Sequence, residues 1–246
     1  MRGVTDRGED FRLGSHDAAA LARAFAADGF VHIPDFLAGD CAERLHAMLR
    51  ARADWRQVVS SESGAVELDR ATRAAMTPEQ RQALDDAVYA RARAGFQFRF
   101  ETIRVPDSAE ARAASADPLA ALAAWLSRGE ARDFLRTVTG ADDIAFADAQ
   151  ATAYSPGDFL TGHDDSIHGK DRRAAYVLGL TPVWRIEWGG LLLFHGADGH
   201  VARGLTPGFN SLNLFAVPAM HSVSEVTRAA AYRRYAVTGW LRTKAG

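Results

Sequence analysis

The segment Tyr154-Ser-Pro-Gly-Asp-Phe-Leu-Thr-Gly-His-Asp-Asp165 joins two short apolar runs through a turn of Ser, Pro, Gly and Asp. Other short strand-like runs lie around it, separated by Gly, Pro, Asp and Asn; they cover residues 145–154, 174–180, 190–194, 211–216 and 235–241. Short strands at this spacing are typical of an antiparallel sandwich or barrel rather than of βαβ units. The segment and its surroundings therefore predict a β core over residues 144–243.

Helical patterns dominate the chain before this core. Helices are expected at residues 17–28, from Asp40 onward, and at 77–93, 118–127 and 130–139. Phe96 to Val105 instead alternates, with Phe96, Phe98 and Phe100 on one face, as in a half-buried strand. We predict an α+β protein with one domain over residues 1–246, in which residues 1–143 form a helical layer with flanking strands. The stretches 60–75 and 106–118 are expected to be loops that influence substrate choice.

The composition argues against several classes of function. The chain has 246 residues with 29 Lys+Arg against 31 Asp+Glu, so it has no basic surplus for binding nucleic acid or an anionic membrane. A single cysteine, Cys41, excludes an internal disulfide and a Cys-rich zinc site. No signal-peptide pattern and no apolar run of roughly 20 residues is seen, so we expect a cytoplasmic protein.

His163 and Asp165 are the first candidate functional residues. On an extended backbone, residues two apart project to the same face, so these two side chains would lie side by side. One imidazole and one carboxylate are two of the three ligands of the facial triad that holds non-haem Fe(II). The third ligand would be His221, at the end of a later apolar strand. Three other histidines are less well placed, since His195 and His200 flank an expected hairpin turn and His168 lies in a charged loop. The alternative is a solvated turn, since a His-x-Asp pair also occurs by chance.

Arg234 is the second candidate. Strand alternation places Arg234, Ala236 and Thr238 on one face and Tyr235 and Val237 on the other. A guanidinium that points into a barrel needs an anionic partner, and a dicarboxylate would provide one through bidentate pairing. The alternative is an arginine at a strand edge that pairs with an Asp or Glu of the chain.

These residues, in this order, resemble the 2-oxoglutarate and Fe(II)-dependent dioxygenases, specifically their prolyl-4-hydroxylase-like branch. The resemblance rests on Tyr154 to Asp165, Trp188-Gly-Gly-Leu191, His221 and Arg234-Tyr-Ala-Val-Thr-Gly-Trp240. Gly29-Phe-Val-His-Ile-Pro-Asp-Phe-Leu37 is also similar to the start of intracellular prolyl hydroxylases of the ribosomal-protein type. The hypoxia-factor-type prolyl hydroxylases belong to the same branch.

The resemblance implies a double-stranded β-helix, a cupin-like jelly roll, that uses Fe(II), 2-oxoglutarate and O₂; ascorbate could stimulate it. His163, Asp165 and His221 would hold the iron. Arg234 would bind the distal carboxylate of 2-oxoglutarate, Tyr154 would donate a phenolic hydrogen bond to it and Thr238 could support it. A tyrosine that some members place on the strand 174–180 is displaced here to Tyr176, for which a core role is equally open. We also expect Gly179 to leave extra room near the co-substrate.

The implied activity is hydroxylation of a prolyl residue in a protein or peptide, with decarboxylation of 2-oxoglutarate to succinate. A second hypothesis is hydroxylation of a free amino acid or small metabolite. The candidates for binding its carboxylate are Arg99, Arg104, Arg172, Arg173 and Arg185. A third is a non-catalytic barrel that binds metal or 2-oxoglutarate.

Overall fold

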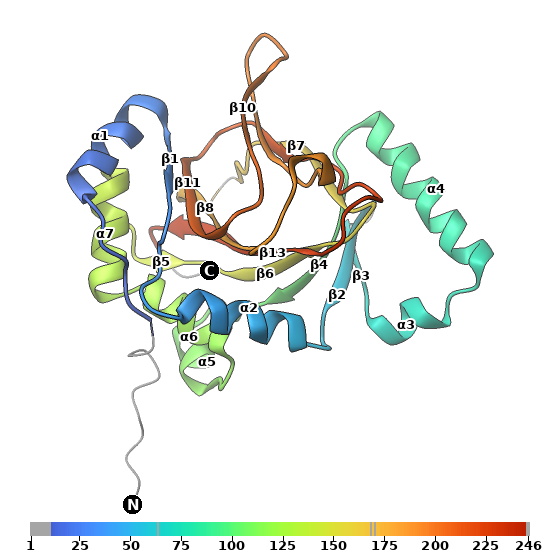
Figure 1. Cartoon of the computed structure of the whole chain (residues 1–246), viewed down its shortest axis with the longest axis horizontal. Helices are drawn as coiled ribbons and strands as arrows, with labels where there is room; N and C mark the ends of the chain where they lie inside the picture. Colours follow the sequence, from blue (N-terminus) through green and yellow to red (C-terminus); the bar gives the residue numbers. More distant parts are fainter. Residues whose placement is uncertain (1–10, 63, 168, 170, 245–246) are drawn as a thin grey trace, which may run out of the picture.

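The computed structural model describes residues 11–62, 64–167, 169 and 171–244, and its centre is one curled antiparallel sheet (Figure 1). Its strands are β1 (Phe30–Ile33), β2 (Arg56–Ser61), β3 (Gly64–Leu68), β4 (Phe98–Arg104), β5 (Phe146–Ala147), β6 (Gln150–Tyr154), β7 (Phe159–His163), β8 (Arg172–Leu180), β9 (Leu192–His195), β10 (Val201–Leu205), β11 (Phe209–Ala216), β12 (His221–Val223) and β13 (Arg234–Arg242). The order of hydrogen-bonded neighbours is β1-β11-β8-β13-β6-β4-β7-β12-β9-β10.

The chain alternates between two walls of this sheet. One wall contains β11, β8, β13 and β6, and the other contains β7, β12, β9 and β10. The connections from β6 to β7, β8 to β9, β10 to β11 and β12 to β13 each cross from one wall to the other. This is the strand order of a jelly roll, so the predicted double-stranded β-helix is confirmed. Three of its strands, β7, β10 and β12, lie outside the strand-like runs predicted from the sequence, and β12 has only three residues, too few to show alternation.

Seven α-helices surround the sheet in the described part of the chain. They are α1 (Ala18–Asp28), α2 (Cys41–Ala51), α3 (Arg70–Ala75), α4 (Pro78–Ala94), α5 (Ala109–Ala114), α6 (Pro118–Leu126) and α7 (Gly129–Thr139), with a short 3₁₀ turn at Ile186–Trp188. The Asp17 side chain accepts a hydrogen bond from the Ala20 N–H at the start of α1, and Gly29 ends this helix with a φ of 64°. The predicted helix boundaries there are confirmed.

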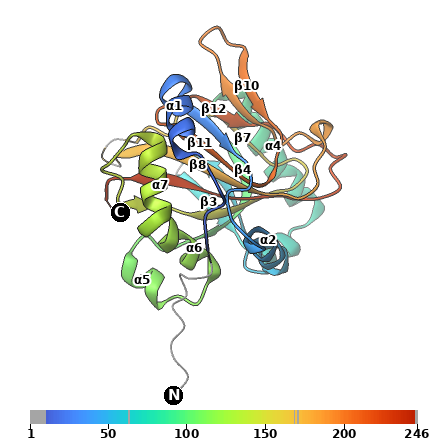
Figure 2. The same ribbon diagram turned by 60° about the vertical axis from the view of Figure 1, so that its left-hand side comes forward.

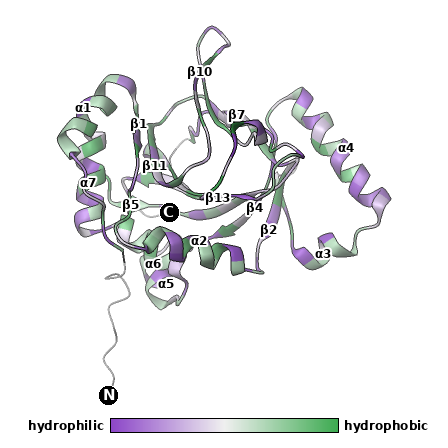
Figure 3. Ribbon diagram, in the orientation of Figure 1, coloured by the Kyte–Doolittle hydropathy of each residue, from purple (hydrophilic) through white to green (hydrophobic). Residues whose placement is uncertain are grey.

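Apolar helices cover one side of the sheet, and a polar helix lies on the other. Buried Leu119, Leu122 and Leu126 of α6 pack into the main hydrophobic core, and α1 and α7 lie side by side (Figure 2). α4, in contrast, is mostly hydrophilic, and Val88 is its only buried residue (Figure 3). A capping box between Thr77 and Gln80 stabilises the start of α4 in place of burial.

The structure corrects the two predicted loops. Residues 60–75 contain most of a hairpin of β2 and β3 followed by α3, and residues 106–118 contain α5. β3 is largely exposed and has no apolar alternation, while α3 and α5 have six residues each, so none of them produces a periodic signal.

The N-terminal strands are part of the same sheet as the core. β1 pairs with β11, and β4 pairs with both β6 and β7. We therefore propose that the described residues form one domain. Among the described helices, none has both the length and the hydropathy needed to cross a bilayer.

Gly239 generates a prediction about stability. A Cβ atom at this position would lie 2.0 Å from the Asp148 carbonyl oxygen and 2.9 Å from the Tyr176 hydroxyl. Gly239→Ala would therefore force β13 away from its neighbours and should lower the free energy of unfolding by about 1–3 kcal/mol. Gly95→Ala is the control, because a Cβ there meets nothing within 4 Å. Urea denaturation checks both variants, and equal stabilities would contradict this account of β13.

Candidate active site

The two histidines of the predicted triad lie on adjacent strands. His163 ends β7, His221 begins β12, and the two residues are direct partners in the β7–β12 pairing. Their ring centroids are 4.1 Å apart. Strand register therefore brings together two imidazoles that are far apart in the sequence.

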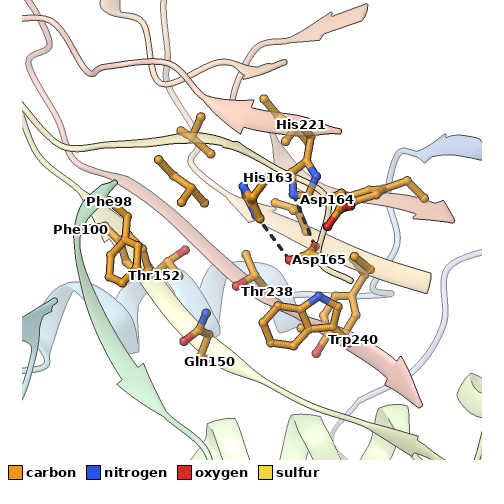
Figure 4. Close-up of a pocket in the computed structure, with 18 of the residues that line it drawn as sticks. Phe98, Phe100, Gln150, Thr152, His163, Asp164, Asp165, His221, Thr238 and Trp240 are labelled. Atoms are coloured by element: carbon orange, nitrogen blue, oxygen red, sulfur yellow. Dashed lines mark ion pairs between the residues drawn. The ribbon is translucent and has the colours of Figure 1, made fainter. Parts of the chain in front are cut away.

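Asp165 completes the cluster, but its backbone conformation differs from the extended one that was predicted. Its backbone has a φ of 62°, so residues 163–165 are not extended and simple alternation does not apply. This turn still directs the carboxylate back toward the histidines, with Asp165 Oδ1 3.4 Å from His163 Nε2 and Oδ2 3.5 Å from His221 Nε2 (Figure 4). The Arg172 guanidinium donates a hydrogen bond to the Asp165 carbonyl oxygen at 2.7 Å, which supports the turn.

Backbone carbonyls orient both imidazoles. The Nδ1 atom of His163 lies 3.1 Å from the Thr161 carbonyl oxygen, and the Nδ1 atom of His221 lies 2.7 Å from that of Ala219. Such a contact places the proton of a neutral ring on Nδ1 and leaves the Nε2 lone pair directed at the centre of the cluster. One ligand atom from each of the three residues lies within 4.8 Å of the others.

Burial and charge keep these donors in the forms that bind a cation. Burial, together with the neighbouring His163, lowers the pKa of His221, which favours its neutral ring. Burial alone would raise the pKa of Asp165, but the two adjacent histidines outweigh that effect and lower this pKa, so the carboxylate is ionised. The cluster therefore offers the ionised carboxylate of Asp165, the neutral imidazole of His221 and the imidazole of His163.

Arg234 lies in the same cavity as the cluster. The cavity has a volume of about 400 Å³, within the usual range for a small-molecule site, and the triad, Arg234, Tyr154 and Thr238 all line it. Arg234 and Tyr154 are direct partners across β13 and β6, and the guanidinium carbon lies 4.9 Å from the tyrosine ring centroid. Arg234 and Thr238 share the inner face of β13, as predicted.

The charge of Arg234 has no counter-charge in the described chain. The residue is 5% exposed, and none of the described carboxylates forms an ion pair with it. Burial lowers the pKa of Arg234, and the adjacent Tyr154 opposes that shift. Burial also raises the pKa of Tyr154, so its hydroxyl stays protonated and can donate a hydrogen bond. The alternative of an internal Asp or Glu partner is therefore not seen among these residues.

A buried arginine on β4 fixes the turn that separates Tyr154 from His163. The Arg99 guanidinium donates to the Gly157 carbonyl oxygen at 2.6 Å and lies 3.3 Å from Asp158 Oδ1. Gly157 has a φ of 90°, and a Cβ there would be 2.8 Å from this guanidinium, so glycine is required. The turn residues between Tyr154 and His163 thus set the spacing of these two side chains, which both line the cavity.

Three further predictions have clear outcomes. The Tyr176 hydroxyl donates to the Asp148 carbonyl oxygen at 2.6 Å, and Tyr176 belongs to the main hydrophobic core, which supports its core role. The expectation of extra room at Gly179 is wrong, because a Cβ there would lie 2.6 Å from the Gly208 carbonyl oxygen. His195 and His200 flank a turn between β9 and β10, as expected, whereas His168 lies outside the described residues.

Of the five arginines considered for a substrate carboxylate, one lines the cavity. Arg99 binds the turn described above and Asp85, and the others pair with surface acids: Arg104 with Glu67, Arg173 with Asp143, and Arg185 with Glu187. Only Arg172 lines the cavity, where its guanidinium lies 3.6 Å from the Trp240 ring centroid.

Sequence reasoning missed several residues that line the cavity. Figure 4 shows Gln150, Thr152 and Trp240 on the wall formed by β6 and β13, and Phe98 and Phe100 on β4. The alternation of the two phenylalanines was visible in the sequence, but the cavity they face was not. For Gln150, the available signal was a polar residue at the start of an otherwise apolar strand.

The donors fit the metal and co-substrate that the resemblance implies. Two neutral imidazoles and one carboxylate are the ligand set of non-haem Fe(II) sites with open positions. A buried, unpaired guanidinium with a protonated phenol beside it fits the distal carboxylate of 2-oxoglutarate.

The β core of this chain is similar to known proteins. A model of the 2OG-Fe(II) oxygenase superfamily matches residues 149–242. Prolyl 3-hydroxylase OGFOD1 of Xenopus laevis is 34% identical over 117 residues, covering 45% of this chain and 22% of that protein. Prolyl 3-hydroxylase sudestada1 of Drosophila melanogaster is 32% identical over 127 residues, covering 46% of this chain and 23% of that protein. The chain therefore spans less than a quarter of the length of these relatives.

A solved structure extends the similarity in fold beyond the matched segment. A prolyl-4-hydroxylase of Pseudomonas putida superimposes with a TM-score of 0.57 and 20% identity, covering 94% of this chain and 98% of that chain. The jelly roll and its helical layer are thus shared. The β core that carries the cavity, residues 149–242, is therefore similar to the 2OG-Fe(II) oxygenase superfamily.

Proposed function

We propose that this protein is an Fe(II)- and 2-oxoglutarate-dependent dioxygenase that hydroxylates a prolyl residue in a protein or peptide. The observation that carries the proposal is one cavity with a His-Asp-His cluster and a buried arginine that has no counter-charge in the described chain. The names of the curated relatives, both prolyl 3-hydroxylases, support the prolyl target.

We assign His163, Asp165 and His221 as the iron ligands. When bound, Fe(II) and 2-oxoglutarate supply the oxidation of a C–H bond by O₂, with succinate and CO₂ as the co-products. The backbone contacts of the two Nδ1 atoms hold the imidazoles in the ligating tautomer. Arg172 keeps the Asp165 turn in place from outside the ligand set.

We assign Arg234, Tyr154 and Thr238 as the groups that bind the co-substrate. Arg234 provides the charge for the distal carboxylate and Tyr154 provides a neutral donor next to it. Phe100 stacks on Tyr154 with a centroid distance of 5.2 Å, and Phe98 lies 5.6 Å from Phe100. This aromatic wall excludes water around the buried charge and strengthens its pairing with an anion.

The rim of the cavity suits an extended polypeptide better than a small charged metabolite. Exposed Phe96 and Ile167 line its mouth, and Phe96 lies 5.7 Å from the His163 ring. Four of the five arginines that could have bound a metabolite carboxylate are paired away from the cavity.

The non-catalytic alternative predicts metal and 2-oxoglutarate binding with no succinate formed.

Anaerobic titration tests the metal site. Addition of Fe(II) and then 2-oxoglutarate should give the visible charge-transfer band of a chelated 2-oxo acid. His221→Ala should abolish this band because one of three ligands is lost. His195→Ala is the matched control, since this neighbouring histidine binds the Ser222 hydroxyl at 2.8 Å and is outside the triad. A band that survives His221→Ala would contradict the ligand assignment.

Arg234→Met tests the co-substrate site. Loss of a charge-assisted pairing should raise the concentration of 2-oxoglutarate needed for half-maximal binding by roughly 10- to 100-fold, with Fe(II) affinity unchanged. Arg173→Met, which removes a surface pair with Asp143, should leave both affinities as they are. Calorimetric titration measures them, and unchanged 2-oxoglutarate affinity in Arg234→Met would remove Arg234 from the site.

A panel of blocked pentapeptides with a central proline tests the substrate class. We expect succinate formation coupled to a mass increase of one oxygen on the prolyl residue of at least one peptide. Free amino acids, tested in parallel, should give succinate only at the uncoupled rate. Coupled turnover with an amino acid alone would support the metabolite hypothesis, and binding without succinate would support the non-catalytic one.

A further inference from the structure

Gln150 is a polar side chain in the cavity that the proposed metal and co-substrate sites do not use. It begins β6, pairs in register with Thr238 of β13, and lines the cavity together with Thr152 and Thr238. Figure 4 shows its amide directed into the space below His163 and Asp165. This wall is neutral, in contrast to the charged end at Arg234.

A buried threonine outside the cavity holds the Gln150 amide. The Thr102 hydroxyl lies 3.2 Å from Gln150 Oε1 and also 3.0 Å from the Ala151 carbonyl oxygen. Thr102 is 3% exposed and belongs to β4, which pairs with β6 at this point. The contact fixes one edge of the amide, while Gln150 Nε2 has no hydrogen-bond partner among the described residues. The free donor edge therefore faces the cavity.

The charges around the cavity favour a neutral group as the partner of this donor. Arg172 is the sole rim arginine in the cavity lining, and it already stacks on Trp240 and donates to the Asp165 carbonyl. Because Arg172 also lies 4.0 Å from Asp165 Oδ1, a carboxylate beside Gln150 would have to share this cation with Asp165. A peptide carbonyl is a neutral acceptor and carries no such cost.

A prolyl residue requires this kind of recognition. Its ring nitrogen has no N–H, so only carbonyl oxygens of the residue and its predecessor are available for hydrogen bonding. We propose that Gln150, oriented by Thr102, donates from Nε2 to a backbone carbonyl of the peptide substrate and so selects a peptide over a free amino acid. This inference rests on the proposed function and names the residue that distinguishes a peptide substrate from a free amino acid.

The test uses the full chain and the fastest blocked pentapeptide of the panel above. In Gln150→Met, kcat/KM for this peptide and its anaerobic affinity for the Fe(II)- and 2-oxoglutarate-loaded protein should both fall about 10-fold, the effect of one hydrogen bond left unmade. Affinity for 2-oxoglutarate and the uncoupled rate of succinate formation should not change. Gln150→Glu keeps the size but removes the donor, so it should show the same loss.

Two further variants separate positioning from general damage. Thr102→Val should reproduce part of the loss, and the Thr102→Val/Gln150→Met double variant should bind the peptide no more weakly than Gln150→Met, because the two residues act as one unit. Gln82→Met, at an exposed glutamine on α4 that binds Asp86, is the control and should leave peptide binding unchanged.

The outcomes separate this inference from the proposed function. Unchanged peptide affinity in Gln150→Met and Gln150→Glu would overturn the inference while leaving the dioxygenase intact. Peptide and 2-oxoglutarate affinities that fall together would also overturn it and place Gln150 in the co-substrate site. Wild-type protein that forms no succinate with any peptide would refute the proposed function, and the inference with it.

Discussion

The buried guanidinium of Arg234 is the constraint on which the rest of the site depends. It lies at the start of β13, between β6 and β8, and its described polar neighbour is the neutral hydroxyl of Tyr154. An unpaired charge in such a place costs folding free energy, and an anionic ligand recovers that cost. The surroundings of Arg234 are therefore less stable without an anionic ligand than a hydrophobic core would be, and binding of the ligand recovers this free energy.

The cavity separates charges of different kinds along its length. Cationic Arg234 is at one end, the anionic carboxylate of Asp165 lies beside two imidazoles at the other, and a neutral polar wall with Gln150 and Thr238 lies between. Because many of the lining side chains are aromatic or aliphatic, each charge acts at a lower dielectric than in water and selects its own partner. A dicarboxylic co-substrate, a divalent cation and an uncharged peptide segment can then occupy one cavity without competing.

Much of this site could be predicted from the sequence, because its parts are local. The turn residues before His163, the alternation of Arg234 with Thr238, and the caps of α1 are short-range patterns with known physical causes. Asp165 shows the limit of such reasoning. The prediction that it lies beside His163 is confirmed, but the extended backbone assumed for it is wrong, since a positive φ and the hydrogen bond from Arg172 bring it there.

The sequence by itself determined the types of the longer helices and strands and the face on which Arg234 lies, because these depend on periodicities of two or 3.6 residues. Only the tertiary structure decided which arginines face the cavity, that Gly179 has no free space, and that Gln150 is held by Thr102. These facts depend on contacts between strands far apart in the chain. Closure of the sheet establishes such contacts, and no local pattern encodes them.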